Sequence, residues 1–319
     1  MAETKTKARR MRELLESGRL VVSPGIYDGY SARLVEKAGF LACSTTGAGV
    51  ANSRLGQPDI GIMSLMENVA ACRDIAMSVS IPVMADADTG YGNPVTVFHA
   101  VQYFENAGVV GINIEDQVNP KRCGHMRGKE LVSPLDAAKK IEAAVKAKKD
   151  PDFIINARTD ALAVEGLEGT IKRCKMYVEA GADMVYPDAI RTVDEIKAVV
   201  DAVGAPVSIN MGFGIRTRPT TPLLSVKQLE DLGVARASFA RMLPAAAIGG
   251  MMKAIDVFKE TLRTGVPADR PDLLASIEDI TDLMGYSFIN NLEGQFLSDD
   301  EIQRRYKDGS RDIVVQGGH

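Results

Sequence analysis

The sequence predicts an α/β fold, a (β/α)8 barrel of the TIM type, and three observations favour it. Eight short apolar runs alternate with amphipathic stretches, which is the pattern of a parallel sheet covered by helices. These units occupy roughly 230 residues, close to the ~250 residues of such barrels. Four segments place a glycine between a helix and the next strand, where a left-handed helix end is expected: KAGF, NAGV, EAGA and DLGV. A doubly wound open sheet is the alternative, but no GxGxxG turn follows the first run.

The apolar runs place the eight strands in chain order. They are LVVSPGIYDG, FLACSTTGAG, IPVMADADTG, VVGINIEDQ, DFIINARTD, DMVYPDAI, APVSINMG and ARASFAR. The amphipathic stretches between them predict helices, because their apolar residues recur at helical spacing. These expected helices lie at 30–38, 95–107, 134–148, 167–180 and 192–203.

The two ends of the chain add helices to this barrel. An amphipathic helix is expected within residues 1–18, and another at 244–263 follows the last strand. Residues at about 265–305 are expected to form a C-terminal helical arm, because LLASIEDITDLMGYSFINNLEGQFL is apolar enough to require burial. We therefore expect one barrel domain over 1–319, with the arm exchanged between subunits of a homotetramer built from two helix-swapped dimers.

Composition narrows the class of partner. The 319 residues have a net charge of −4 with acids and bases mixed, so we expect no nucleic-acid partner and no anionic membrane surface. No apolar run reaches the ~18 residues of a membrane span, and the charged start lacks the apolar stretch of a secretory signal. The expected partner is a small molecule, and the expected location is cytoplasmic. The four cysteines are widely spaced, which disfavours disulfides and a zinc site.

Three carboxylates are expected to meet at the mouth of the barrel, where strand carboxyl ends converge. Asp86 and Asp88 end the third strand two positions apart, so a regular strand would point both to one face. Glu115 ends the neighbouring fourth strand. Three acids facing one space repel each other unless a cation such as Mg²⁺, or Mn²⁺ in its place, lies between them. The alternative is that they are helix caps or surface acids.

The segment PKRCGH suggests a proton donor in a loop. Cys123 follows Lys121 and Arg122 and precedes Gly124 and His125. Nearby cations favour the thiolate, so this thiol would release its proton readily. A buried, unreactive cysteine is the alternative, and zinc binding would need further ligands that the sequence does not supply.

Arg158 in ARTD also lies at a strand end, where its guanidinium could bind a substrate carboxylate or form a structural ion pair with Asp160.

Several motifs in register resemble one known family. DADTGYGN, GINIEDQ, PKRCGH, ARTDA and EAGADM occur in the order seen in the isocitrate lyase and phosphoenolpyruvate mutase superfamily, and the likeness covers about residues 21–247. It is greatest to the methylisocitrate and 2,3-dimethylmalate lyase branch, for which the KRCGH form is specific. The resemblance implies a carbon-carbon lyase that uses Mg²⁺ to split a 2-hydroxy di- or tricarboxylate into a 2-oxo acid, such as pyruvate, and a carboxylic acid.

The resemblance also implies roles for individual residues. Asp86 and Asp88 would hold the metal, with Glu115 assisting directly or through water. Cys123, on a loop that closes over the site, would protonate the carboxylate fragment with support from Lys121 and His125, and Arg158 would stabilise the developing charge. Thr46 and the amides of Gly47 and Ala48 would form the substrate-carboxylate cradle, Asp59 would lie near the metal, and the remaining substrate contacts would be Ser44, Gly124, Asp188 and Asn210.

Three departures from the family pattern bear on the substrate. Ser44 stands where the lyases usually have an aromatic hydroxyl, and Asp188 is shorter than the usual acid. After Asn210, MGFGIRTRPTTPL adds Arg216 and Arg218, which either bind a further carboxylate or belong to a solvated loop. Alternative activities are an oxaloacetate decarboxylase or hydrolase and a phosphonate mutase. A non-catalytic binding protein is a third reading, which the complete set of acids disfavours.

Overall fold

The computed structural model describes residues 5–124, 126–214 and 220–306 of the chain. Its contacts divide the chain into two compact units that meet between Met251 and Met252. The first unit contains all eight strands, and the second contains three helices and the end of a fourth. None of the helices in the described ranges has the length and apolar character that crossing a bilayer requires.

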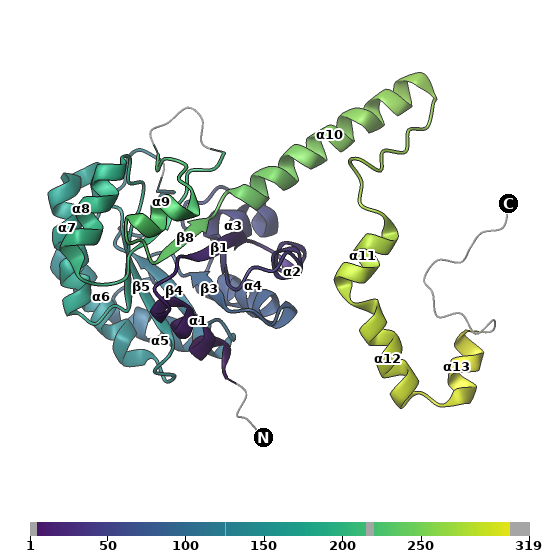
Figure 1. Ribbon diagram of the computed structural model, residues 1–319, viewed down its shortest axis with the longest axis horizontal. Coiled ribbons are helices and arrows are strands. Elements are labelled where there is room, and N and C mark those ends of the chain that lie inside the picture. The colour runs from purple at the N-terminus through teal and green to yellow at the C-terminus, as the bar shows by residue number, and fades with distance from the viewer. Residues whose placement is uncertain (1–4, 125, 215–219, 307–319) are drawn as a thin grey trace. The chain divides into compact units, whose positions relative to one another are not determined.

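The first unit is a barrel of eight parallel strands (Figure 1). The strands pair in the order β6-β5-β4-β3-β2-β1-β8-β7, and a parallel bridge between Val185 and Val207 nearly closes the ring. The predicted (β/α)8 architecture is therefore confirmed. The strands are β1 (Val21–Ile26), β2 (Cys43–Thr45), β3 (Val83–Asp86), β4 (Gly111–Glu115), β5 (Ile154–Thr159), β6 (Met184–Pro187), β7 (Ser208–Asn210) and β8 (Arg236–Phe239).

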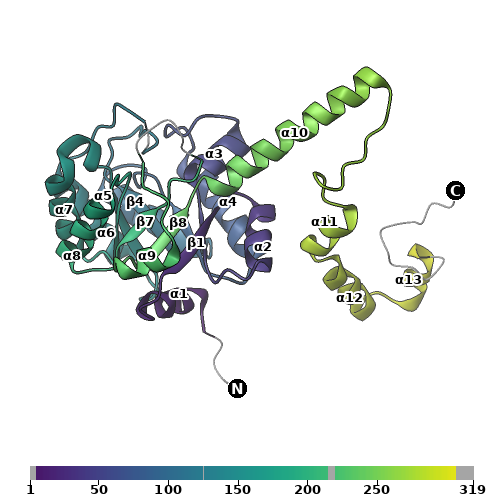
Figure 2. The same ribbon diagram turned by 45° about the horizontal axis from the view of Figure 1, so that its top comes forward.

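Helices surround the strands of this unit (Figure 2). All of them except α7 begin at a side-chain cap, for example Asn93 before α5 and Ser133 before α6, each followed by proline in the first turn. The helices are α2 (Gly29–Lys37), α3 (Gly47–Leu55), α4 (Leu65–Ser78), α5 (Pro94–Asn106), α6 (Pro134–Ala147), α7 (Leu162–Glu179), α8 (Val193–Val203) and α9 (Val226–Asp231).

The four glycines predicted to end helices have the expected backbone. Gly39, Gly108, Gly181 and Gly233 have φ values of 84°, 85°, 96° and 80°. A side chain is strained at these angles, whereas glycine adopts them freely. Each glycine therefore ends its helix and turns the chain toward the next strand.

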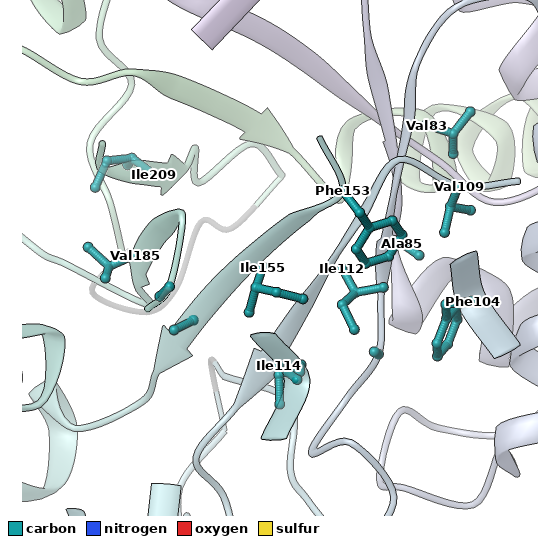
Figure 3. Packing of buried hydrophobic residues seen from close by; sticks show 14 of the residues in the cluster. Val83, Ala85, Phe104, Val109, Ile112, Ile114, Phe153, Ile155, Val185 and Ile209 are labelled. Carbon is teal, nitrogen blue, oxygen red and sulfur yellow. The ribbon is translucent and has the colours of Figure 1, made fainter. Parts of the chain in front are cut away.

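Two apolar clusters hold this unit together. The larger lies between the strands and the outer helices, where Val83, Ala85, Ile112 and Ile155 face Phe104 of α5 and its neighbours (Figure 3). The smaller lies at the amino ends of the strands, where α1 (Lys7–Glu16) covers the barrel. Met11 of α1 is fully buried there, in a cluster with Val21, Met84, Ile154 and Met184. The helix expected within residues 1–18 thus serves as the bottom of the barrel.

The C-terminal helices are α10 (Met242–Thr264), α11 (Ile277–Met284), α12 (Tyr286–Phe296) and α13 (Asp299–Arg305). The predicted helix at 244–263 matches α10, and the arm at about 265–305 contains the other three. None of the residues described in these four helices is buried. Phe258, Leu262 and Phe288 expose 62%, 69% and 62% of their surface. The helix swap and the single-domain organisation stay predictions.

Candidate functional site

A cavity opens at the carboxyl ends of the strands, as the barrel fold requires. Its volume is about 610 Å³ when the open solvent at its mouth is counted. It brings together most of the residues that the sequence predicted for a site. These are Ser44, Thr46, Ala48, Asp59, Asp86, Cys123, Gly124, Arg158, Asp188 and Asn210.

Lys121 lies among the acids beside this cavity. Its Nζ is 2.5 Å from Asp59 Oδ1 and 2.8 Å from Asp88 Oδ1. The lysine was expected to support Cys123, whereas here its charge faces carboxylates. Asp88 reaches this position in an unexpected way: β3 ends at Asp86, and Asp88 has a φ of 48°, so a turn and not a regular strand directs its side chain.

The protein supplies few hydrogen-bond donors to Asp88 and Glu115. Both carboxylate oxygens of Glu115 and Oδ1 of Asp88 are buried without a hydrogen bond, although Lys121 and Arg158 form ion pairs with these acids. The pKa of Asp88 is raised to about 6, and the pKa of Glu115 is raised well above its ordinary value. Burial is the main cause of both shifts. Buried carboxylate oxygens that have only an ion pair, and no further hydrogen bond, suit an oxygen-seeking dication.

The acids nevertheless do not form a closed metal cage. Among the residues described, no group of three His, Cys, Asp or Glu side chains is arranged to hold an ion. Asp86 is engaged elsewhere, because its Oδ2 accepts from the Gly47 amide at 3.1 Å. Water and substrate oxygens would therefore have to complete the coordination of any bound Mg²⁺.

Arg158 pairs with acids from three directions. Its Nε lies 3.2 Å from Glu115 and 2.9 Å from Asp160, and its Nη2 lies 2.9 Å from Asp188. The structural ion pair with Asp160 is therefore confirmed. The guanidinium also lines the cavity, and its binding of a substrate carboxylate stays a prediction. The ring of Tyr186 lies 5.3 Å from the guanidinium carbon, and its hydroxyl donates to Asp188 Oδ1 at 2.7 Å.

The loop of Cys123 is anchored over the cavity. Gln117 binds the backbone of Arg122 twice, at 2.8 and 2.9 Å. Lys129 Nζ donates to the carbonyl oxygen of Gly124 at 2.6 Å. A Cβ at Gly124 would lie only 1.7 Å from Asp188 Oδ2, so only glycine fits here. His125 lies outside the described residues.

The thiol of Cys123 has a cationic neighbour that the sequence did not reveal. Arg241, two residues after β8, donates from Nη2 to Cys123 Sγ at 2.9 Å. The sequence pointed to Lys121 and Arg122 because they are adjacent in the chain. In the structure the cation that contacts this thiol is Arg241, from across the barrel, and its only sequence signal is its place just past a strand end.

The expected cradle is partly engaged within the protein. The Thr46 hydroxyl caps α3 by accepting a hydrogen bond from the Gly49 amide. The Gly47 amide donates a hydrogen bond to Asp86. Asn210 Oδ1 accepts from the Ser238 hydroxyl and the Ala240 amide at 3.3 and 3.2 Å. Arg216 and Arg218 lie outside the described residues.

Sequence comparisons agree with this geometry. A family model described as phosphoenolpyruvate phosphomutase matches residues 11–258. The chain is 38% identical over 290 residues to 2,3-dimethylmalate lyase of Eubacterium barkeri, covering 91% of this chain and 98% of that protein. It is 40% identical over 278 residues to 2-methylisocitrate lyase of Aeropyrum pernix, covering 86% of each.

Solved structures show the same likeness. A 2,3-dimethylmalate lyase superposes with a TM-score of 0.86 at 32% identity, covering 98% of this chain and 100% of the other. An oxaloacetate acetylhydrolase in complex with 3,3-difluorooxalacetate gives 0.83 at 32% identity, covering 91% and 97%. A phosphonopyruvate hydrolase in complex with oxalate and Mg²⁺ gives 0.81 at 31% identity, covering 92% and 100%. The chain therefore belongs to the phosphoenolpyruvate mutase and isocitrate lyase superfamily and is a carbon-carbon lyase of that superfamily.

Proposed function

We propose that this chain is a Mg²⁺-dependent lyase that cleaves a 2-hydroxy di- or tricarboxylate of the methylisocitrate or dimethylmalate type. The products would be a 2-oxo acid such as pyruvate and a carboxylic acid. One observation carries this proposal: Cys123 lines the same cavity as Asp86 and Arg158, with its thiol held by Arg241. A proton donor, a guanidinium and a carboxylate around one cavity, with Asp88 and Glu115 lining neighbouring pockets, are what such a cleavage requires.

The structure supplies an acid for one part of the reaction and carboxylates for another. The substrate hydroxyl would pass its proton to one of the carboxylates that line the cavity, its oxygen would form the new carbonyl, and the carbon-carbon bond would break. The electron pair of that bond passes to the departing carboxylate fragment as an enolate, and the S–H of Cys123 supplies the proton that forms its C–H bond. The Arg241 guanidinium at 2.9 Å stabilises the thiolate that remains.

Asp86, Asp88 and Glu115 would hold the metal, with Mn²⁺ as a substitute for Mg²⁺. The ion would act as a Lewis acid at the carboxylate and carbonyl oxygens of the forming 2-oxo acid. Lys121 lies 2.8 Å from Asp88 and reduces the repulsion among these acids. The loop of Cys123 and Gly124 would exclude water from the enolate during turnover.

The test is an assay of the purified protein with Mg²⁺ against methylisocitrate, dimethylmalate, isocitrate and oxaloacetate. Formation or loss of 2-oxo acid is followed, and chelation of the metal with EDTA provides the control. Pyruvate from one of the branched hydroxy acids supports the proposal. Consumption of oxaloacetate alone, or no reaction, contradicts it.

Hydrolysis of oxaloacetate is the second candidate. It is supported by the TM-score of 0.83 with the oxaloacetate acetylhydrolase structure. The same assay separates the two candidates, because this reaction would yield oxalate and acetate without pyruvate.

We also propose that the chain assembles as a homotetramer of helix-swapped dimers. The described residues of α10 to α13 bury none of their side chains, so their apolar residues need a partner surface. Light scattering coupled to gel filtration should give four times the chain mass of 34.3 kDa. Removal of residues 265–319 should lower that mass, and a monomeric full-length chain would contradict the proposal.

A further inference from the structure

A second buried guanidinium lies deep in the cavity. Arg236, the first residue of β8, is only 1% exposed and lines the same cavity as Arg158. Its side chain crosses the barrel interior to three serines. Nη1 donates to Ser208 at 2.9 Å, and Nη2 donates to Ser44 at 2.7 Å and to Ser23 at 3.4 Å.

The surroundings of Arg236 differ from those of the other two buried arginines. Arg158 pairs with three carboxylates, and Arg173 pairs with Asp116 and Glu165. In the described part of the chain, no carboxylate oxygen lies within 4.0 Å of a nitrogen of Arg236. Its Nε is buried without any acceptor. Serine hydroxyls can accept hydrogen bonds, but they cannot neutralise a charge.

This charge persists at neutral pH. Burial lowers the pKa of Arg236 to about 10, which still leaves it protonated at pH 7. A buried charge without a counterion is costly, and replacing it by an apolar side chain would ordinarily stabilise a protein. An anion that enters the cavity would supply the missing counterion, because a guanidinium binds a carboxylate through two parallel hydrogen bonds.

Ser44 makes room for this arrangement. Its small side chain accepts a hydrogen bond from Arg236 Nη2 at 2.7 Å inside the barrel and leaves space beside the guanidinium. We propose that Arg236 and Ser44 form an anion-binding subsite at the floor of the cavity, which takes a second carboxylate of the substrate. The inference rests on the proposed function for the identity of the ligand, and it makes Arg236 the residue that selects dicarboxylates over monocarboxylates.

Two inert probes test the subsite without turnover. Succinate and propionate differ by one carboxylate, and their dissociation constants in 5 mM MgCl₂ can be measured by calorimetry. The wild-type chain should bind succinate at least about tenfold more tightly, since a charge-assisted pair is worth roughly 1.5–3 kcal/mol. Arg236→Met should bind both probes about equally, Arg236→Lys should retain part of the preference, and Arg54→Met, on the exposed surface of α3, should retain all of it.

Thermal unfolding separates this subsite from a structural role. Without anions, Arg236→Met should melt at or above the wild-type temperature, because an unpaired buried charge has been removed. Succinate should raise the melting temperature of the wild type and leave that of the variant unchanged. A structural role would instead lower the melting temperature of both Arg236 variants and preserve the preference of Arg236→Lys for succinate at the wild-type value.

The proposal is overturned if a folded Arg236→Met keeps the wild-type preference for succinate, or if the wild type shows no preference. It is also overturned if both Arg236 variants fail to fold, because Arg236 would then be structural. Failure of the proposed function is distinguishable: it appears as absence of lyase turnover while the preference for succinate still depends on Arg236.

Discussion

The two ends of the barrel bury opposite kinds of side chain. At the amino ends of the strands, Met11 packs with Val21 and Ile154 in an apolar cluster. At the carboxyl ends, Glu115 and Arg158 lie among charges, and both carboxylate oxygens of Glu115 lack hydrogen bonds. The same strands thus supply stability at one end and chemistry at the other, and a change at one end should leave the other property intact.

The largest effect should follow from Cys123→Ser. A serine hydroxyl is a far weaker acid than a thiol, so carbon-carbon cleavage should fall by about 10²–10⁴-fold in kcat. Mg²⁺ binding and the melting temperature should stay unchanged, because the thiol lies at the mouth and is half-buried. Cys174→Ser, the same change in α7 away from the cavity, is the matched control and should keep its activity per folded molecule. Wild-type turnover by Cys123→Ser would exclude this thiol as the acid.

Met11→Ala should have the converse effect at the opposite end. Truncation of a fully buried methionine should lower the free energy of unfolding by about 2–5 kcal/mol, as measured by urea denaturation. The kcat of the folded fraction should not change. Met77→Ala in α4, where the side chain is 78% exposed, should alter stability by less than about 0.5 kcal/mol. A change in kcat with Met11→Ala would show that the two ends of the barrel are not independent.

Metal binding should depend on pH through Asp88. Its pKa is raised to about 6, chiefly by burial, so a proton competes with Mg²⁺ below that pH. Affinity measured by calorimetry should be constant above pH 7 and should fall up to about tenfold per pH unit below pH 6. Asp88→Asn should bind weakly and should keep only the pH dependence that the raised pKa of Glu115 causes. The same dependence in Asp88→Asn would assign the titration to another group.

The four thiols should differ in reactivity. Burial raises the pKa of Cys43, Cys72 and Cys174 to about 12, so almost none of these thiols is ionised at pH 8. Iodoacetamide should therefore modify only Cys123 in the native chain and all four thiols in urea, as counted by mass spectrometry. Native Cys123→Ser should take up no label. Rapid modification of any other cysteine would mean that the barrel opens locally.

Periodic features of the sequence predicted the fold well. The alternation of apolar runs and the glycines at helix ends both reflect local backbone geometry. Local geometry can be predicted from a short stretch of sequence. Much of the cavity lining was predictable for a similar reason, because strand carboxyl ends converge in any barrel of this type. Asp86 and Arg158 were placed at the mouth on that basis.

Contacts between distant segments were not predictable in the same way. Arg241 and Arg236 belong to β8 and its exit, and only the closed ring brings them to Cys123 and Ser44. Lys121 was assigned to the thiol because it is near Cys123 in sequence, yet it lies beside Asp59 and Asp88. Two residues that are close in the sequence can be expected to contact each other only where the backbone is a regular helix or strand. The loop that carries Lys121 and Cys123 is neither.

The glycine at position 124 has a consequence for the timing of the reaction. Its backbone lies directly against Asp188 and Arg158, so the position of the loop is coupled to the ion pair between that acid and that guanidinium. On the proposed mechanism, an anion that drew Arg158 away from Asp188 would also loosen the loop. Departure of an anionic product and opening of the loop would then be one coupled event.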